Sequence, residues 1–90
     1  MAKSQASRKN AQEYSSPEAA FGRILRQRRK ALGLRQSDLE HQDFLDQSYI
    51  SKLERGERQV CLRGILHLAN VLQIKPGELI DEVARNITHL

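Results

Sequence analysis

The chain has 90 residues, 39% of them hydrophobic, and a net charge of +4, which suits one small basic domain. No apolar run approaches the roughly 20 residues of a membrane-spanning helix, and the amino terminus lacks the apolar core of a signal peptide, so we expect a cytoplasmic protein without membrane contact. A single cysteine excludes an internal disulfide, and three histidines widely separated in sequence argue against a metal site. The sequence shows no glycine-rich phosphate loop and no nucleophile beside a base, so we expect no cofactor, no small-molecule ligand and no enzymatic activity.

The first 16 residues differ in composition from the rest of the chain. They are rich in Ser, Gln, Ala, Asn and Lys, with Tyr14 as the only large side chain, so we expect a disordered tail. A helix then begins at Pro17 with Ser16 as its N-cap, because proline is favoured at the first helical position. This helix ends at Gly33, and its predicted inward stripe consists of Phe21, Leu25 and Leu32.

Two short helices follow, joined by a tight connection. The first spans residues 36–41 with Leu39 inward, and its N-cap position holds Arg35, where Ser or Thr would cap more strongly. The second spans residues 47–55, capped by Asp46 and ended by Gly56. Two helices at this spacing predict a helix-turn-helix, in which the first helix braces the second against a DNA backbone.

The second of these helices carries the candidate base-reading surface. Ile50 and Leu53 lie three residues apart and are predicted to face inward. The opposite side holds polar side chains that can hydrogen-bond to base edges in the major groove: Gln47, Ser48, Ser51 and Lys52. The sequence therefore predicts a DNA-reading helix over residues 47–55.

Two more helices complete the chain. One begins near Leu62, with Cys61 as a small cap residue before it. Its apolar residues cover nearly two faces of the helix, which predicts that this helix is central and buried: Leu62, Ile65, Leu66, Leu68, Ala69 and Leu72. The other begins at Pro76, and its apolar residues exceed what one helix needs to cover a small core: Leu79, Ile80, Val83, Ala84, Ile87 and Leu90. We therefore expect an all-α, compact five-helix domain over residues 17–90 that forms a homodimer through its last helix.

Positive charge gathers beside the predicted reading helix. Residues 17–33 contain five basic side chains against one acidic side chain, a local charge of +4, whereas residues 34–56 have a local charge of −2. A basic surface attracts nucleic acid but also occurs on ordinary solvated helices. The motif, more than the charge, favours double-stranded DNA as the partner.

From Phe21 to Ile80 the chain resembles the XRE family, the lambdoid phage repressor and Cro type of helix-turn-helix domain. The block from Tyr49 to Gly56 carries most of this resemblance, and further matching positions include Phe21, Gly22, Arg29, Gly33, Leu34, Gln36, Leu39, Leu62, Leu68, Ala69, Leu72, Glu78 and Leu79. The resemblance implies a five-helix repressor-like fold and transcriptional regulation. It also implies a homodimer on a pseudo-palindromic operator, with the third helix in the major groove.

The resemblance further implies roles for individual residues. The base-contacting positions are Gln47, Ser48, Ser51 and Lys52, and the phosphate-contacting positions are Gln36, Arg35, Tyr49, Arg55 and Arg58. Arg29 and Glu54 fall on positions that in this family form a partly buried ion pair between the first and third helices.

Two residues depart from the family pattern. Glu40 stands where the family prefers a small residue, and Phe44 stands where it prefers glycine in the turn. A bulky aromatic residue adopts a positive φ only with strain. We therefore expect the turn to follow a different or longer path, with Phe44 or Leu45 buried and Glu40 toward solvent.

Three functions remain open at this point. The first is a sequence-specific regulator that acts alone or controls a mobile or restriction element. The second is the DNA-binding antitoxin of a toxin pair, and the third is a protein-interaction module that has lost DNA binding. An antitoxin needs a partner-binding segment, and residues 1–16, its only candidate, show no amphipathic pattern. The interaction module is supported by acidic residues near the reading surface: Glu40, Asp43 and Asp46. Salt-dependent binding of duplex DNA separates a regulator from such a module.

Overall fold

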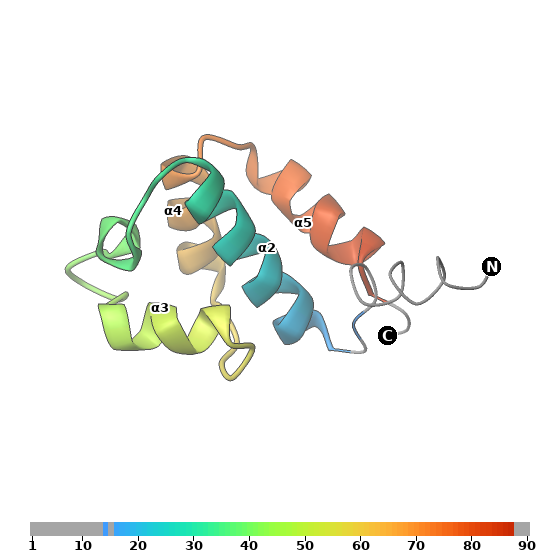
Figure 1. Ribbon diagram of the computed structural model, residues 1–90, viewed down its shortest axis with the longest axis horizontal. Coiled ribbons are helices and arrows are strands. Elements are labelled where there is room, and N and C mark those ends of the chain that lie inside the picture. Colours follow the sequence, from blue (N-terminus) through green and yellow to red (C-terminus); the bar gives the residue numbers. More distant parts are fainter. Residues whose placement is uncertain (1–13, 15, 88–90) are drawn as a thin grey trace.

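The computed structural model describes Tyr14 and residues 16–87, which form an all-helical domain (Figure 1). Its elements in chain order are α2 (Pro17–Ala31), the 3-10 helix η1 (Gln36–Leu39), α3 (Gln47–Glu54), α4 (Leu62–Val71) and α5 (Pro76–Arg85). The all-α class is therefore confirmed. The helix expected over residues 36–41 is a single 3-10 turn, so the described residues contain four α-helices and not five.

Local side chains explain where the helices begin. The Ser16 hydroxyl accepts a hydrogen bond from the Ala19 N–H at 3.0 Å, and the Asp46 carboxylate accepts one from the Tyr49 N–H at 2.8 Å. Both predicted N-caps are thus confirmed, and the Cys61 thiol caps α4 in the same way. Arg35 provides no side-chain cap for η1. The Asp38 carboxylate instead accepts a hydrogen bond from the Arg35 N–H at 2.8 Å, which partly compensates for the missing cap.

Helix α2 lies at the centre of the domain, between α3 and α5, and contacts both (Figure 1). Helix α4 packs against α5 and η1, and η1 also contacts α3. The buried core draws on every element: Ala20, Phe21, Ile24, Leu25, Leu39, Leu45, Ile50, Leu53, Leu68, Ala69, Leu72, Leu79 and Val83. The predicted inward positions of Ile50 and Leu53 are confirmed, and both side chains are fully buried.

Three leucines that were expected in the core lie at the surface. Leu32 is 42% exposed because α2 ends at Ala31, and the chain turns outward before Gly33, whose φ is +73°. Leu62 and Leu66 are 72% and 51% exposed, since α4 is covered on one side only. The prediction of a central buried α4 is therefore wrong.

Helices α2 and α3 lie in close contact at Gly22. A Cβ atom at this position would lie 2.7 Å from the Glu54 carbonyl oxygen and closer still to the Leu53 carbonyl oxygen. Both obstacles are backbone atoms, which cannot rotate away. Gly22 therefore sets how closely α3 can rest on α2.

Most of the tail predicted over residues 1–16 lies outside the described residues, as does Leu90. Tyr14, which is described, donates its backbone N–H to the Asn86 carbonyl at 3.0 Å, and its side chain packs against the core. Within residues 14 and 16–87, no helix is both long enough and apolar enough to cross a membrane.

Candidate nucleic-acid interface

The outward face of α3 carries the four side chains that the sequence predicts for base contacts. Gln47 and Ser48 are exposed, and Ser51 and Lys52 are half-exposed. The buried side chains of Ile50 and Leu53 hold the opposite face of α3 against the domain. This arrangement presents amide, hydroxyl and ammonium groups on one side of a short helix, and these groups suit hydrogen bonds to base edges.

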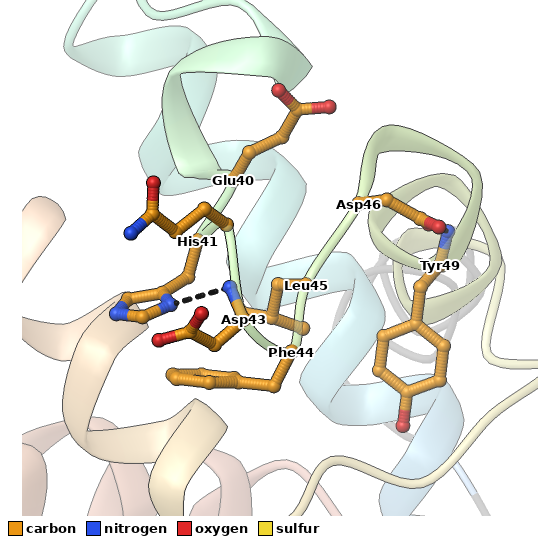
Figure 2. A pocket seen from close by; sticks show the side chains of 8 residues that line it. Glu40, His41, Asp43, Phe44, Leu45, Asp46 and Tyr49 are labelled. Atoms are coloured by element: carbon orange, nitrogen blue, oxygen red, sulfur yellow. Dashed lines mark hydrogen bonds between the residues drawn. The ribbon is translucent and has the colours of Figure 1, made fainter.

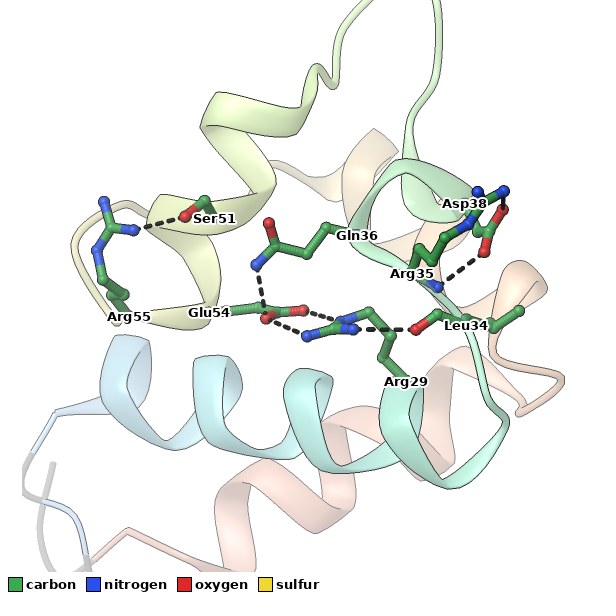
Figure 3. Close-up of polar contacts among 8 residues, drawn as sticks. All are labelled: Arg29, Leu34, Arg35, Gln36, Asp38, Ser51, Glu54 and Arg55. Atoms are coloured by element: carbon green, nitrogen blue, oxygen red, sulfur yellow. Dashed lines mark hydrogen bonds and ion pairs between the residues drawn. The ribbon is translucent and has the colours of Figure 1, made fainter.

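A buried ion pair fixes α3 on α2 (Figure 3). The Arg29 guanidinium donates two hydrogen bonds to the Glu54 carboxylate, with Nε–Oε2 and Nη2–Oε1 distances of 2.6 and 3.0 Å. The exposed fractions of the two side chains are only 10% and 1%. The hydrogen bonds that Arg29 donates to the Glu54 carboxylate raise the pKa of Arg29 above its ordinary value. Arg29 also donates to the Leu34 carbonyl at 2.9 Å, so it joins α2, α3 and the segment before η1.

Gln36 belongs to the same network. Its amide nitrogen donates to Glu54 Oε1 at 3.0 Å, which turns the side chain inward from the start of η1 (Figure 3). A phosphate contact by this residue would therefore fall to its backbone N–H or its amide oxygen. The same hydrogen bond completes the coordination of the buried carboxylate, which accepts from both Arg29 and Gln36.

The connection between η1 and α3 takes an unusual path (Figure 2). His41 and Leu45 exchange two backbone hydrogen bonds, of 2.9 and 3.0 Å, that close a tight loop. Within this loop the Asp43 N–H donates to the His41 ring at 3.1 Å, as Figure 2 shows. Leu45 is buried, Glu40 is exposed, and Phe44 has no positive φ, so the expected alternative path is confirmed. Phe44 stacks on the His41 ring with a centroid distance of 4.0 Å. The loop thus replaces the left-handed glycine of the family by aromatic packing.

An open cavity of about 540 Å³ lies between this loop and the start of α3 (Figure 2). Three carboxylate side chains border it: Glu40, Asp43 and Asp46. Their negative charge makes this side of α3 electrostatically unfavourable for a phosphate group. Although His41 and His67 are distant in sequence, their rings lie 5.1 Å apart beside the loop, and among the described residues no group of three or more metal-binding side chains gathers.

The predicted phosphate-contacting side chains differ in how they are held. The guanidinium of Arg55 bonds to the Glu57 carboxylate at 3.0 and 3.2 Å and to the Ser51 hydroxyl at 2.5 Å (Figure 3 shows the latter). This pairing raises the pKa of Arg55 and lowers that of Glu57. Arg35 lies 3.4 Å from Asp38, whose pKa is lowered first by the Arg35 backbone N–H and then by its guanidinium.

Of the two remaining candidates, Tyr49 lies in the first turn of α3 and Arg58 lies in the loop after it. The Tyr49 hydroxyl donates to the Gln59 carbonyl and thereby ties α3 to the loop that follows it. Arg58 is exposed in that loop and has no carboxylate within 4 Å in the part of the chain that the structure describes. Of the predicted phosphate-contacting arginines, only Arg58 forms no salt bridge with a carboxylate of the described residues.

The residues predicted to form a dimer through α5 are divided between core and surface. Leu79 is fully buried and Val83 is 7% exposed, so both are used inside the monomer, and the expectation that they are surplus is wrong. Ile87 is half-buried, whereas Ile80, at 41%, and Ala84 are exposed. The helix period identified the apolar positions, but it could not tell that α2 and α4 cover two of them.

Sequence reasoning singled out no role for Arg23 and Arg26. Both are exposed on α2, and they line a cleft of about 380 Å³ with Tyr14, Ala19, Glu54 and Arg55. The available signal was their spacing of three residues, which places two arginines on one face of a helix.

The chain is similar to known helix-turn-helix proteins. A family described as a helix-turn-helix domain matches residues 20–83. The restriction-modification controller protein C.AhdI from Aeromonas hydrophila is 47% identical, with a TM-score of 0.63 over 69% of this chain and 94% of that one. The clp gene regulator ClgR from C. glutamicum is 25% identical, with a TM-score of 0.66 over 76% and 88% of the two chains.

A third structure, the restriction-modification controller protein C.Esp1396I, shares the fold. Its TM-score is 0.67 at 20% identity, and the match covers 81% of this chain and 94% of that one. No curated protein matches the sequence.

Proposed function

Since the chain belongs to the helix-turn-helix family of DNA-binding transcriptional regulators, which are not enzymes, we propose that it binds one operator sequence in duplex DNA through α3. We further propose that it is a controller of a restriction-modification system, and that it acts in the cytoplasm at the nucleoid. The identity of 47% to C.AhdI, over nearly the whole length of that protein, supports the narrower role. The observation that carries the proposal is the polar outward face of α3.

Base recognition falls to Gln47, Ser48, Ser51 and Lys52. A glutamine amide can bond an adenine edge with two hydrogen bonds, and a lysine ammonium can reach guanine O6 and N7. The Ser51 hydroxyl accepts from Arg55, so its own proton is left for an acceptor on a base. Backbone phosphates fall to the surrounding basic side chains, of which Arg58 has the most accessible charge among the predicted set.

Replacing Gln47 or Lys52 by alanine should lower the affinity for the selected operator about 5-fold to 150-fold, since one base contact contributes about 1 to 3 kcal/mol. Selection from a random duplex pool should show one base preference lost in each half-site, with non-specific affinity nearly unchanged. Arg58→Ala is the matched control and should weaken all duplexes equally. A consensus that survives both α3 changes would contradict the proposal, because another surface would then read the bases.

We propose that the functional form is a homodimer that binds a pseudo-palindromic site. Two apolar side chains on α4, Leu62 and Leu66, lie one helical turn apart and are the most exposed large hydrophobic residues that the structure describes. Exposed apolar patches on small soluble proteins commonly mark interfaces. We assign the dimer contact to this α4 face, together with Ile80 of α5, in place of the buried Leu79 and Val83.

The change Leu62→Gln with Leu66→Gln should convert the dimer into a folded monomer, because both side chains contribute little to the core. Sedimentation at micromolar concentration measures this directly. Leu32→Gln, at an exposed leucine on the far end of α2, should leave the dimer intact. A monomeric wild-type protein, or a double variant that remains a dimer, would refute the assigned interface.

A further inference from the structure

We propose that Arg23 and Arg26 of α2 bind the DNA backbone at a second site, outside the helix-turn-helix itself. The proposal rests on the proposed function and adds to it a contact on a helix that carries no predicted DNA-binding residue. The ligand chemistry is that of a phosphodiester, to which a guanidinium can donate two parallel hydrogen bonds.

Salt bridges separate the arginines whose charge a carboxylate already balances from those whose charge is not balanced in this way. Carboxylates occupy four guanidinium groups: Arg28 pairs with Glu82 at 2.8 Å, and similar pairs join Arg29 to Glu54, Arg35 to Asp38 and Arg55 to Glu57. Within the described residues, no carboxylate lies within 4 Å of Arg23 or Arg26. The charges of Arg23 and Arg26 are therefore not balanced by a nearby carboxylate, whereas those of Arg28 and Arg29 on the same helix are.

The two side chains project into a place where a phosphate can be reached. Arg23 and Arg26 line one cleft together with Arg55, which directly follows α3. A helix that lies in the major groove brings the DNA backbone against its flanks and against neighbouring elements. Because α2 packs on α3, the cleft lies next to the reading helix. It includes Glu54 and Arg55 at the end of α3, whereas the acidic loop of residues 40–46 leads into the start of α3.

The other residues of the cleft do not oppose an anion. Glu54 is the only acidic residue that lines it, and its carboxylate is 1% exposed and neutralised by Arg29. Arg55 is balanced by Glu57, so the net positive charge of the cleft comes from Arg23 and Arg26. Tyr14 adds a phenolic hydroxyl, which can donate to a phosphate oxygen.

The test compares the full-length protein with the variant Arg23→Gln plus Arg26→Gln. Affinity is measured for the selected operator and for an unrelated duplex, between about 50 and 200 mM salt. Loss of two phosphate contacts per protomer should weaken both duplexes by the same factor and make the slope of log affinity against log salt shallower by about two units per protomer. The selected consensus should not change, because phosphate contacts do not read sequence.

A matched control removes two positive charges elsewhere. Lys75 and Arg85 are exposed on either end of α5, which lies on the far side of α2 from α3 (Figure 1). Lys75→Gln with Arg85→Gln should change the affinity and the salt slope far less. Equal effects of the two double variants would show a general charge effect and overturn the proposed site.

The outcomes also separate this inference from the proposed function. If the wild-type protein selects a consensus but the Arg23 and Arg26 variant binds both duplexes with unchanged affinity and slope, only the second site is refuted. A changed consensus in that variant would also refute it, because the two arginines would then read bases. If the wild-type protein selects no consensus, the proposed function fails, and the second site fails with it.

Discussion

Replacing Glu54 by alanine should lower the free energy of unfolding by about 3 to 5 kcal/mol, because it leaves the guanidinium of Arg29 buried without a counter-charge. The lost interactions are specific: two hydrogen bonds from Arg29 and one from the Gln36 amide. With side-chain exposures of 10% and 1%, neither member of the pair can turn to solvent for compensation. Urea denaturation followed by circular dichroism measures the loss.

A double-mutant cycle identifies the cause of that loss. Arg29→Ala with Glu54→Ala should cost less than the sum of the two single changes, since no charge is then left unpaired. Glu57→Ala provides the exposed control: it removes the partner of Arg55, half of whose side chain is in solvent, and should change stability little. Additive single changes would show that the two side chains do not interact energetically.

Gly22→Ala should destabilise the protein by about 3 kcal/mol, the upper end of the usual range for overpacking. The new methyl group would lie 2.7 Å from one backbone carbonyl oxygen of α3 and 2.9 Å from a carbonyl carbon, so the whole helix must move away from α2. That shift separates Arg29 from Glu54 and reorients the reading face, and the variant should therefore also lose specific DNA binding.

Gly77→Ala is the matched control for this change. Position 77 lies in the first turn of α5, where a Cβ atom would meet nothing within 4 Å. Alanine is favoured over glycine in a helix by about 1 kcal/mol, so this variant should be as stable as the wild type or slightly more stable. An unchanged denaturation midpoint for Gly22→Ala would contradict the close contact between α2 and α3.

The sequence by itself determined the features that depend on neighbours along the chain. The N-caps at Ser16 and Asp46 follow from a short polar side chain reaching a backbone N–H three residues ahead. The inward register of Ile50 and Leu53 follows from the helical period, and the same period predicts which polar residues share the outward face of α3. The strain that Phe44 would suffer at a positive φ was enough to predict a different loop path with Phe44 or Leu45 buried, and in the structure Leu45 is the buried residue.

Only the tertiary structure decided which apolar faces are covered and which charges are balanced. The helical period groups Leu62 with Leu66 and Leu79 with Val83 equally well, yet the first two are exposed and the last two are buried. Coverage depends on where the other helices lie, and one helix's own sequence does not contain that information. The arginines behave in the same way: Arg28 and Arg29 are held by glutamates 54 and 25 residues away, whereas Arg23 and Arg26 face a cleft. The sequence shows how many arginines the chain has, but only folding decides which of them lie beside a carboxylate and which stay free for a partner.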